Sequence, residues 1–404
     1  RANAVAGEDL ITFNIPPTAQ NCEPTTGSCT LYLAAELPAL STNVRIEGPT
    51  QGRVTVRRRG NTGDFRIFTV TTATDVTISG LTITNGKPVG PTSGGAIANS
   101  SSAVVNVLDS VLTTNSVNAN AGGGGAIANT GTGTINVINS AISDNTTNID
   151  VVDGAWGGGG AIINSSSGTV NVSKSAVVGN KVQGGRRNSV MTGGAIFNAL
   201  TGTVNVTDSV ISANTLTVAN ASGAYGGGGG ISLAAGTVNV TNTLVGDNFV
   251  SGGDPAEGLR GGGLLNQSAG SVSVVNSAIY NNQVQGWGGG IANPGGTLKV
   301  TNSTLTNNKG IGGGIFGKGT VKSSLIAKNI YGALVDVDVS GTFTSEGFNF
   351  IGVENGSTGF TAPTDQKGTG AAPLDPKLDP TGLTITLTAT DFQAPGVPLC
   401  GSPM

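Results

Sequence analysis

Apolar and polar residues alternate strictly in the middle of a unit that recurs eight times between residues 85 and 329. In the stretch TVNVT at 203–207, a period of two directs Val204 and Val206 to one face and the polar side chains to the other. This pattern predicts a short β-strand with one buried face. Helices are not expected, because the unit is rich in glycine, asparagine and β-branched residues.

The unit has one part of constant length and one part of variable length. From the apolar residue after each glycine run to the asparagine that closes the unit, as from Ile97 to Asn115, the step is 18 or 17 residues in seven copies and 14 in the last. The return path from each asparagine to the next apolar residue varies between 7 and 17 residues. A constant core with a variable insert at one corner is typical of a solenoid.

The shortest complete copy, at 288–311, contains three extended pieces, GIAN, TLKVTN and STLTNN. Three short strands per coil predict an all-β, triangular parallel β-helix whose rungs stack ~4.8 Å apart. We expect a single solenoid of roughly 11–12 coils with loop inserts at one corner. Its regular repeats at 85–329 follow irregular coils and a cap at 1–84, and precede a last coil with a C-terminal cap or tail at 330–404.

Asparagines recur at two fixed places of the unit. Asparagine tolerates left-handed turns and its amide can bond the next rung, so we expect stacked hydrogen-bonded ladders, with ligand binding as the alternative. The first column consists of Asn115, Asn145, Asn180, Asn214, Asn248, Asn282, Asn308 and Asn329. The second column, which Leu233 interrupts, consists of Asn99, Asn129, Asn164, Asn198, Asn266 and Asn293.

Several motifs carry a family resemblance. GGAI, as at 94–97, together with apolar-x-x-Asn resembles the repeats of polymorphic outer-membrane proteins, which more typically carry FxxN. RANAVAGEDLITF, VRIEGP, RIFTV and ISGLTITNG near the start, and FNFIG, LDPKLDPTGLTITLTA and CGSPM near the end, look like secreted bacterial β-helix proteins with a CSLREA-type N-terminal region. The Leu-Arg-Glu-Ala element itself is missing. The resemblance implies right-handed coiling, secretion and a cell-surface location, and it assigns no catalytic residue.

Composition and charge exclude several classes of protein. Glycine accounts for 67 of 404 residues, yet no G-X-Y period is present, which excludes collagen. The periodic aliphatic residues exclude a disordered chain. With a net charge of −3 and no basic stripe, nucleic acid is not an expected partner. No run of 18 apolar residues is present, so we predict no transmembrane helix.

Three cysteines bear on the compartment. Cys22 and Cys29 flank the turn-rich segment EPTTGS and can close a small hairpin disulfide, which favours an extracellular or cell-surface location. Cys400 is left without an obvious partner.

An enzyme is not expected, although parallel β-helices include polysaccharide lyases and hydrolases. The chain contains no histidine, which removes histidine-based triads and histidine metal sites. Asp109 and Asp208 share one column, and Asp144 and Asp247 share another, but each pair stands three rungs apart, roughly 14 Å at rung spacing. We interpret these acids as substitutes for asparagine.

The insert corner is the candidate binding site. Aromatic rings spaced along this flank can stack on sugar faces, while arginines bind acidic groups and acids bind hydroxyl groups or calcium. We predict no resident cofactor and leave a metal open. The alternative is that each ring only fills the corner where an insert rejoins the coil. The candidate residues are Trp156, Tyr225, Trp287, Arg186, Arg187, Asp150 and Asp153, with Asp254 and Glu257 in a further insert.

These observations favour a secreted or cell-surface β-helix that acts in adhesion or as a structural element of the cell envelope. One alternative is a filament subunit that stacks end to end, and another is a polysaccharide-binding or pectin-lyase-like protein. A flat outward face, as at 203–207, offers a further surface for ice, glycan or a second solenoid.

Overall fold

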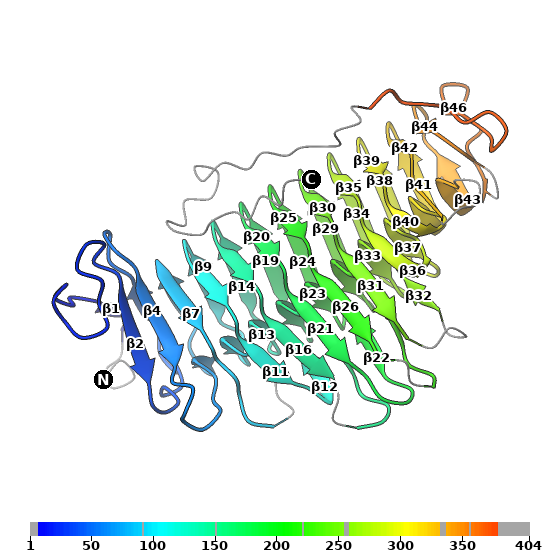
Figure 1. Cartoon of the computed structure of the whole chain (residues 1–404). Helices are drawn as coiled ribbons and strands as arrows, with labels where there is room; N and C mark the ends of the chain where they lie inside the picture. Colours follow the sequence, from blue (N-terminus) through cyan, green and yellow to red (C-terminus); the bar gives the residue numbers. More distant parts are fainter. Residues whose placement is uncertain are drawn as a thin grey trace.

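The structure is a computed structural model that describes residues 7–90, 93–149, 152–219, 222–253, 258–331, 337–354 and 357–378. These residues form 46 β-strands and no helix. The named strands pair in parallel with the strands of the next coil, and the coils stack into one elongated solenoid (Figure 1). The parallel β-helix predicted from the repeat is therefore confirmed. Three sheets, which we call faces A, B and C, run along it.

Face A contains two columns of strands. The first column comprises β5 (Phe68–Val70), β8 (Ile97–Asn99), β13 (Ile127–Asn129), β18 (Ile162–Asn164), β23 (Ile196–Asn198), β28 (Ile231–Leu233), β33 (Leu264–Asn266) and β37 (Ile291–Asn293). The second comprises β1 (Asp9–Thr12), β3 (Val44–Glu47), β6 (Asp75–Ser79), β9 (Val104–Leu108), β14 (Thr134–Ile138), β19 (Thr169–Ser173), β24 (Thr203–Thr207), β29 (Thr237–Thr241), β34 (Ser271–Val275) and β38 (Thr297–Thr301). The long strand β41 (Ile315–Lys322) pairs with the last strand of both columns. On the following coils, β43 (Val339–Ser345) pairs with β41, and β45 (Ser357–Thr358) pairs with β43.

Face B takes one strand from each coil. It comprises β2 (Cys29–Leu33), β4 (Val54–Arg58), β7 (Leu81–Thr84), β10 (Val111–Thr113), β15 (Ala141–Ser143), β20 (Ala176–Val178), β25 (Val210–Ser212), β30 (Leu244–Gly246), β35 (Ala278–Tyr280), β39 (Thr304–Thr306), β42 (Leu325–Ala327), β44 (Phe350–Ile351) and β46 (Gln366–Lys367). Its 13 strands, within the described residues, slightly exceed the predicted 11–12 coils because short end segments also pair.

Face C is formed by the return path. Its strands before the insert are β11 (Ser116–Asn118), β16 (Thr146–Ile149), β21 (Lys181–Gly184), β26 (Thr215–Val218), β31 (Phe249–Gly252), β36 (Gln283–Trp287) and β40 (Lys309–Ile311). Those after it are β12 (Ala121–Gly123), β17 (Trp156–Gly158), β22 (Val190–Thr192), β27 (Tyr225–Gly227) and β32 (Leu259–Arg260). The three predicted strands per coil are thus present, and two more frame each insert.

Two local features explain these additional strands. Thr147 and Ile149 of β16 are fully buried and their neighbours are not, which is the alternation of a strand that faces the core. On the other side of the insert the rungs approach closely, since a Cβ on Gly158 would lie 1.6 Å from the carbonyl oxygen of Thr192. Only glycine fits there. In β36 the insert is lost, and this single strand pairs with both β31 and β32.

The core is a set of aliphatic columns held in register. Val170, Val204 and Val238 occupy one column on successive rungs and are inaccessible to solvent. Full burial of such a side chain stabilises the fold by about 1.5–3 kcal/mol. Because every rung repeats the same columns, the strand alternation seen in the sequence fixes the register of the whole solenoid.

The first asparagine column forms a continuous ladder inside the turn between faces B and C. The side-chain amide of Asn145 donates to Oδ1 of Asn180 at 2.9 Å, and that of Asn180 donates to Oδ1 of Asn214 at 3.0 Å. The ladder continues in the same direction through Asn308 to Asn329, whose amide donates to the carboxylate of Asp338. All of its asparagines, from Asn115 to Asn329, are fully buried.

The second asparagine column is interrupted. Its amides connect Asn99 to Asn198 through Asn129 and Asn164, at 3.0–3.2 Å. Leu233 follows Asn198 in register, and beyond it Oδ1 of the buried Asn266 has no hydrogen-bond partner among the described residues. Oδ1 of Asn293 also has no partner among the described residues, so the ladder ends at Asn198 and does not resume beyond Leu233.

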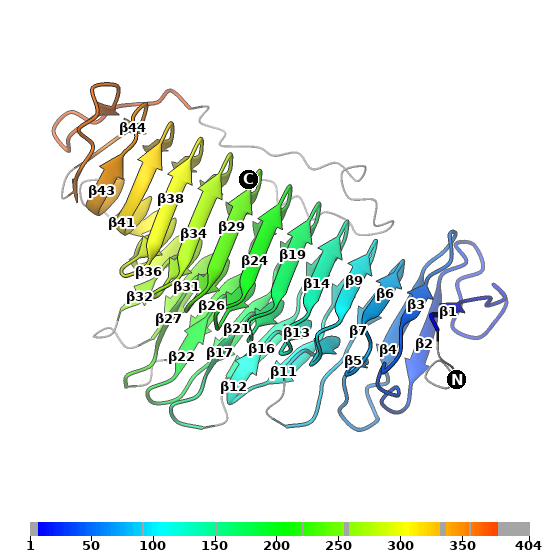
Figure 2. The ribbon, with the colours of Figure 1, turned by 180° about the vertical axis from the view of Figure 1, so that it is seen from behind.

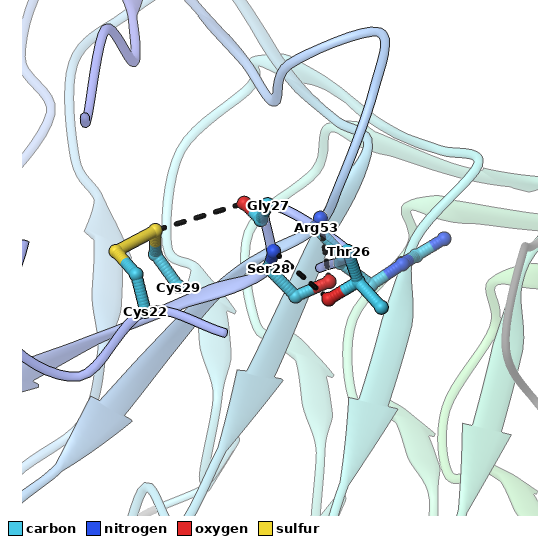
Figure 3. The surroundings of a disulfide bond; sticks show 6 residues. All are labelled: Cys22, Thr26, Gly27, Ser28, Cys29 and Arg53. Carbon is cyan, nitrogen blue, oxygen red and sulfur yellow. Dashed lines mark hydrogen bonds between the residues drawn. A yellow bond between two sulfur atoms is a disulfide. The ribbon is translucent and has the colours of Figure 1, made fainter. Parts of the chain in front are cut away.

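The two ends of the solenoid differ from its middle. At the N-terminal end a disulfide joins Cys22 and Cys29 and closes a hairpin against β2 (Figure 3). At the same end of the solenoid, Leu10 of the edge strand β1 is 61% exposed. At the other end, Phe360 is fully buried and its ring lies 5.2 Å from that of Phe343. The C-terminal end thus buries an aromatic pair, whereas the N-terminal end leaves an edge strand exposed.

Candidate functional site

The inserts leave the solenoid along one edge of face C, and they stack on one another. The backbone N–H of Gly154 donates to the carbonyl of Arg187 at 2.7 Å, and that of Asn188 donates to the carbonyl of Ser222 at 3.0 Å. Three successive inserts are therefore linked through their backbones (Figures 1 and 2). This insert edge carries the aromatic and charged candidates of the sequence.

Trp156 and Tyr225 stand in one column on the insert edge. Trp156 pairs in register with Val190, and Val190 pairs with Tyr225, so the two rings lie two rungs apart, roughly 10 Å. Trp156 is 40% exposed. Its ring meets that of Phe197 in a T-shaped contact, with centroids 6.3 Å apart. Trp156 therefore fills the corner with one side and presents the other to solvent.

Trp287 does not join this column. In register it matches Arg260, which matches Gly227, two positions beyond Tyr225. Its ring lies 6.2 Å from that of Phe316, and the guanidinium of Arg260 lies 5.9 Å from its centroid. A Cβ on Gly258 would lie 1.7 Å from its ring. Trp287 is thus packed into the corner on several sides.

The charged candidates lie on the inserts themselves. Arg186, Arg187 and Asp153 are exposed. The backbone N–H of Arg186 donates to the hydroxyl of Ser189 at 2.9 Å, which shapes the turn of this insert. Asp150, Asp254, Glu257 and Cys400 lie outside the described residues. In the described part of the chain, no three histidine, cysteine, aspartate or glutamate residues gather closely enough to hold a metal ion.

The acids of the regular coils belong to tight turns. Asp109 and Asp208 have φ values of 50°, and Asp144 and Asp247 have φ values of 56°, in the left-handed region that asparagine and aspartate tolerate. The carboxylate of Asp208 accepts a hydrogen bond from the amide of Asn242 on the next rung at 3.0 Å. Asp247 accepts in the same way from Asn281 at 2.6 Å. Asp109, Asp208 and Asp247 thus each accept a hydrogen bond along the solenoid axis, as an asparagine would.

A groove follows the corner between faces A and B over four rungs, and the sequence analysis did not single it out. Its volume is about 490 Å³. One wall consists of the left-handed residues Asp208, Asn242, Asn276 and Asn302, and the other of Val210, Leu244, Ala278 and Thr304. Ser209, Thr243 and Ser277 line the groove between the two walls, and their hydroxyls donate to backbone carbonyls two residues earlier. The sequence signal for this groove is a recurring triplet that follows each strand of the second column of face A: Asp or Asn, then Ser or Thr, then a small or apolar residue.

The fold defines the class of protein, a parallel β-helix. It carries stacked inserts along one edge of face C and a groove between faces A and B. Comparison of the chain with models of known protein families, with curated proteins and with solved structures found no match. No helix long and apolar enough to cross a membrane occurs in the parts of the chain that the structure describes.

Proposed function

We propose that this protein is a non-catalytic β-helix of the cell surface or the extracellular space, which acts in adhesion or as a structural element of the cell envelope. The observation that carries the proposal is the pair Trp156 and Tyr225, in one column on an edge built from stacked inserts. A rigid edge of this kind can hold two aromatic rings at positions where both stack on sugars of one glycan chain.

Three further observations support the proposal. The resemblance of the chain's ends to secreted bacterial β-helix proteins favours the same location. The Cys22–Cys29 disulfide is of a kind that persists in oxidising compartments. Three acids of the regular coils, Asp109, Asp208 and Asp247, accept hydrogen bonds from asparagines of the next rung, which favours a non-catalytic role.

Binding of the protein to a glycan array tests the insert edge. Trp156→Ala and Tyr225→Ala should each weaken binding about tenfold, a loss of about 1.4 kcal/mol. Phe348→Ala is the matched control, because Phe348 is 68% exposed and lies in the C-terminal part of the chain. Equal binding by all four proteins would exclude the insert edge as the adhesive site. Release of sugar from any polysaccharide by the wild-type protein would contradict the non-catalytic role.

The edge strand β1 favours a second candidate, a filament subunit that stacks end to end. Within the described residues β1 pairs only with β3, and both Leu10 and Ile11 are exposed on it. An exposed apolar edge strand is a template for pairing with another chain. Electron microscopy at high protein concentration tests this candidate, and Leu10→Lys should abolish any filaments. A preparation of monomers alone would contradict it.

A further inference from the structure

The groove between faces A and B offers hydrogen-bonding groups that the protein itself leaves unused. The amide of Asn242 donates to Asp208, but the side-chain amides of Asn276 and Asn302 have no hydrogen-bond partner among the described residues, and both side chains are exposed. On the flat outward face nearby, by contrast, the amide of Asn239 is engaged by Asn205 at 2.8 Å. A polar ligand can therefore form more hydrogen bonds with side-chain amides in the groove than on the flat face.

The opposite wall of the groove is mainly apolar. Val210, Leu244 and Ala278 occupy one column on successive rungs of face B. Amides on one side and aliphatic groups on the other match a ligand that carries hydroxyl groups along its edges and C–H groups on its ring faces. A sugar ring has this distribution.

The groove is long in one direction. From Asp208 to Asn302 it spans four rungs, or three steps of ~4.8 Å, roughly 14 Å in total. Similar groups recur on every rung, so each unit of a regular polymer laid parallel to the solenoid axis meets similar partners. Asp208 is the only charged residue among those that line the groove. Its negative charge disfavours a polyanion.

We propose that this groove binds a neutral, linear polysaccharide laid parallel to the solenoid axis. The proposal rests on the proposed adhesive function for its biological sense, but it uses no residue of the insert edge. Asn276 and Asn302 hydrogen-bond hydroxyl groups of the sugar chain. Leu244 and Ala278 contact its ring faces.

Calorimetric titration with short linear fragments of glucan, mannan and xylan tests the proposal, with an oligogalacturonate as the charged comparison. Ala278→Phe fills the groove, and Leu244 in the same column shows that a larger apolar side chain is accommodated there. Ala141→Phe is the matched control, because Ala141 occupies the same column of face B outside the groove. Asn276→Lys is a second variant, and Lys174 already occupies this left-handed position with a φ of 49°.

At least one neutral fragment should bind the wild-type protein, and Ala278→Phe should weaken this binding tenfold or more. Ala141→Phe should leave it unchanged, and Asn276→Lys should weaken it severalfold. Melting temperatures of all variants identify any that fail to fold. The proposal is overturned if no neutral fragment binds, if the oligogalacturonate binds more tightly, or if both phenylalanine variants behave alike. Binding lost in Trp156→Ala but kept in Ala278→Phe overturns the groove site and supports the insert edge.

Discussion

Asp338 receives the last hydrogen bonds of the first asparagine ladder from Asn329. Its Oδ1 accepts from the amide of Asn329 at 2.8 Å and from the backbone N–H of the same residue at 2.9 Å. Its Oδ2 accepts from the backbone N–H of Val353 at 2.8 Å. The side-chain amide of every asparagine in the ladder donates a hydrogen bond to the next rung, whereas an ionised carboxylate can only accept hydrogen bonds. The column thus ends on a group that needs no onward acceptor.

Asp338→Asn should therefore destabilise the C-terminal coils. In either orientation of its amide, the new NH₂ group faces a buried donor, Asn329 or Val353, and an unsatisfied buried group costs about 1–3 kcal/mol. Hydrogen exchange of β42 and β44 measures the loss. Asp208→Asn is the control, since it makes the same chemical change at an exposed turn and should cost less than about 0.5 kcal/mol. Equal effects of the two variants would show that the end of the ladder contributes nothing specific.

The interruption at Leu233 makes a second prediction. Leu233→Asn loses about 1.5–3 kcal/mol of apolar burial. It regains a partner for the orphaned Oδ1 of Asn266, whose desolvation costs about 1–3 kcal/mol. The two terms nearly cancel, so urea unfolding should show a change below about 1 kcal/mol.

The reverse change, Asn164→Leu, gives the comparison for Leu233→Asn. It breaks an intact ladder by removing the partners of both Asn129 and Asn198. It should cost about 2–4 kcal/mol, from two buried polar groups left unsatisfied. If Leu233→Asn proved the more damaging of the two, the ladder would matter less than the aliphatic core.

The fold and the asparagine ladder were predictable from the sequence because both repeat at a fixed step. Val204 and Asn214 each have counterparts one coil away, so a local pattern reports a long-range contact. Asp338 was not predictable, because it lies nine residues after Asn329 instead of one coil later. The strands of the return path were also missed, since β17 and its neighbours are short and separated from the preceding strands by inserts of different lengths.

At the insert edge, too, only residues that recur at a fixed step could be placed from the sequence. Trp156 and Tyr225 each stand six residues before the apolar residue of their unit, and this shared phase places them in one column. Trp287 stands four residues before Ile291, because the insert is lost from its coil. Its registry with Arg260 depends on that loss and becomes evident only when the strands are paired.

The packing of Trp287 can be tested together with Gly258. Trp287→Ala should destabilise the protein by about 3 kcal/mol, because a packed aromatic ring leaves a cavity. Trp156→Ala should cost about 1 kcal/mol, since a large part of its ring is already in water. Thermal unfolding of the two variants compares them directly.

A double-mutant cycle isolates the contact between Gly258 and Trp287. Gly258→Ala forces a Cβ into the ring and also strains a φ of +69°, whereas in a Trp287→Ala background only the strain remains. The substitution should therefore be more destabilising in the wild-type protein than in Trp287→Ala. Additive effects would contradict the contact.

The Cys22–Cys29 disulfide should stabilise the N-terminal end alone. The two cysteines are seven residues apart, and closing so short a loop contributes about 2–3 kcal/mol. In a solenoid each coil contacts only its neighbours, so the effect should decay along the axis. Cys22→Ser with Cys29→Ser should speed hydrogen exchange in β2 and β4 and leave β24 unchanged. A uniform increase along the chain would indicate that the solenoid unfolds as one unit.

The carboxyl group of Asp375 supplies a prediction on pH. A hydrogen bond from the backbone N–H of Lys377, at 2.9 Å, together with the ammonium groups of Lys377 and Lys328, each at 3.2 Å, lowers its pKa from the ordinary 3.8 to about 2. Since the pKa in the folded protein lies below the unfolded value, the contacts stabilise the position of the segment around Asp375 above pH 3.8. Their contribution is lost as the pH falls through about 2.

A carbon NMR titration of this carboxyl group should show a midpoint near 2 in the wild-type protein. Lys328→Met should move the midpoint part of the way towards 3.8, because the backbone donor of Lys377 remains. Lys367→Met is the matched control, since Lys367 pairs with Glu354 instead and should leave the midpoint unchanged. A wild-type midpoint near 3.8 would contradict the ion pair between Asp375 and Lys328.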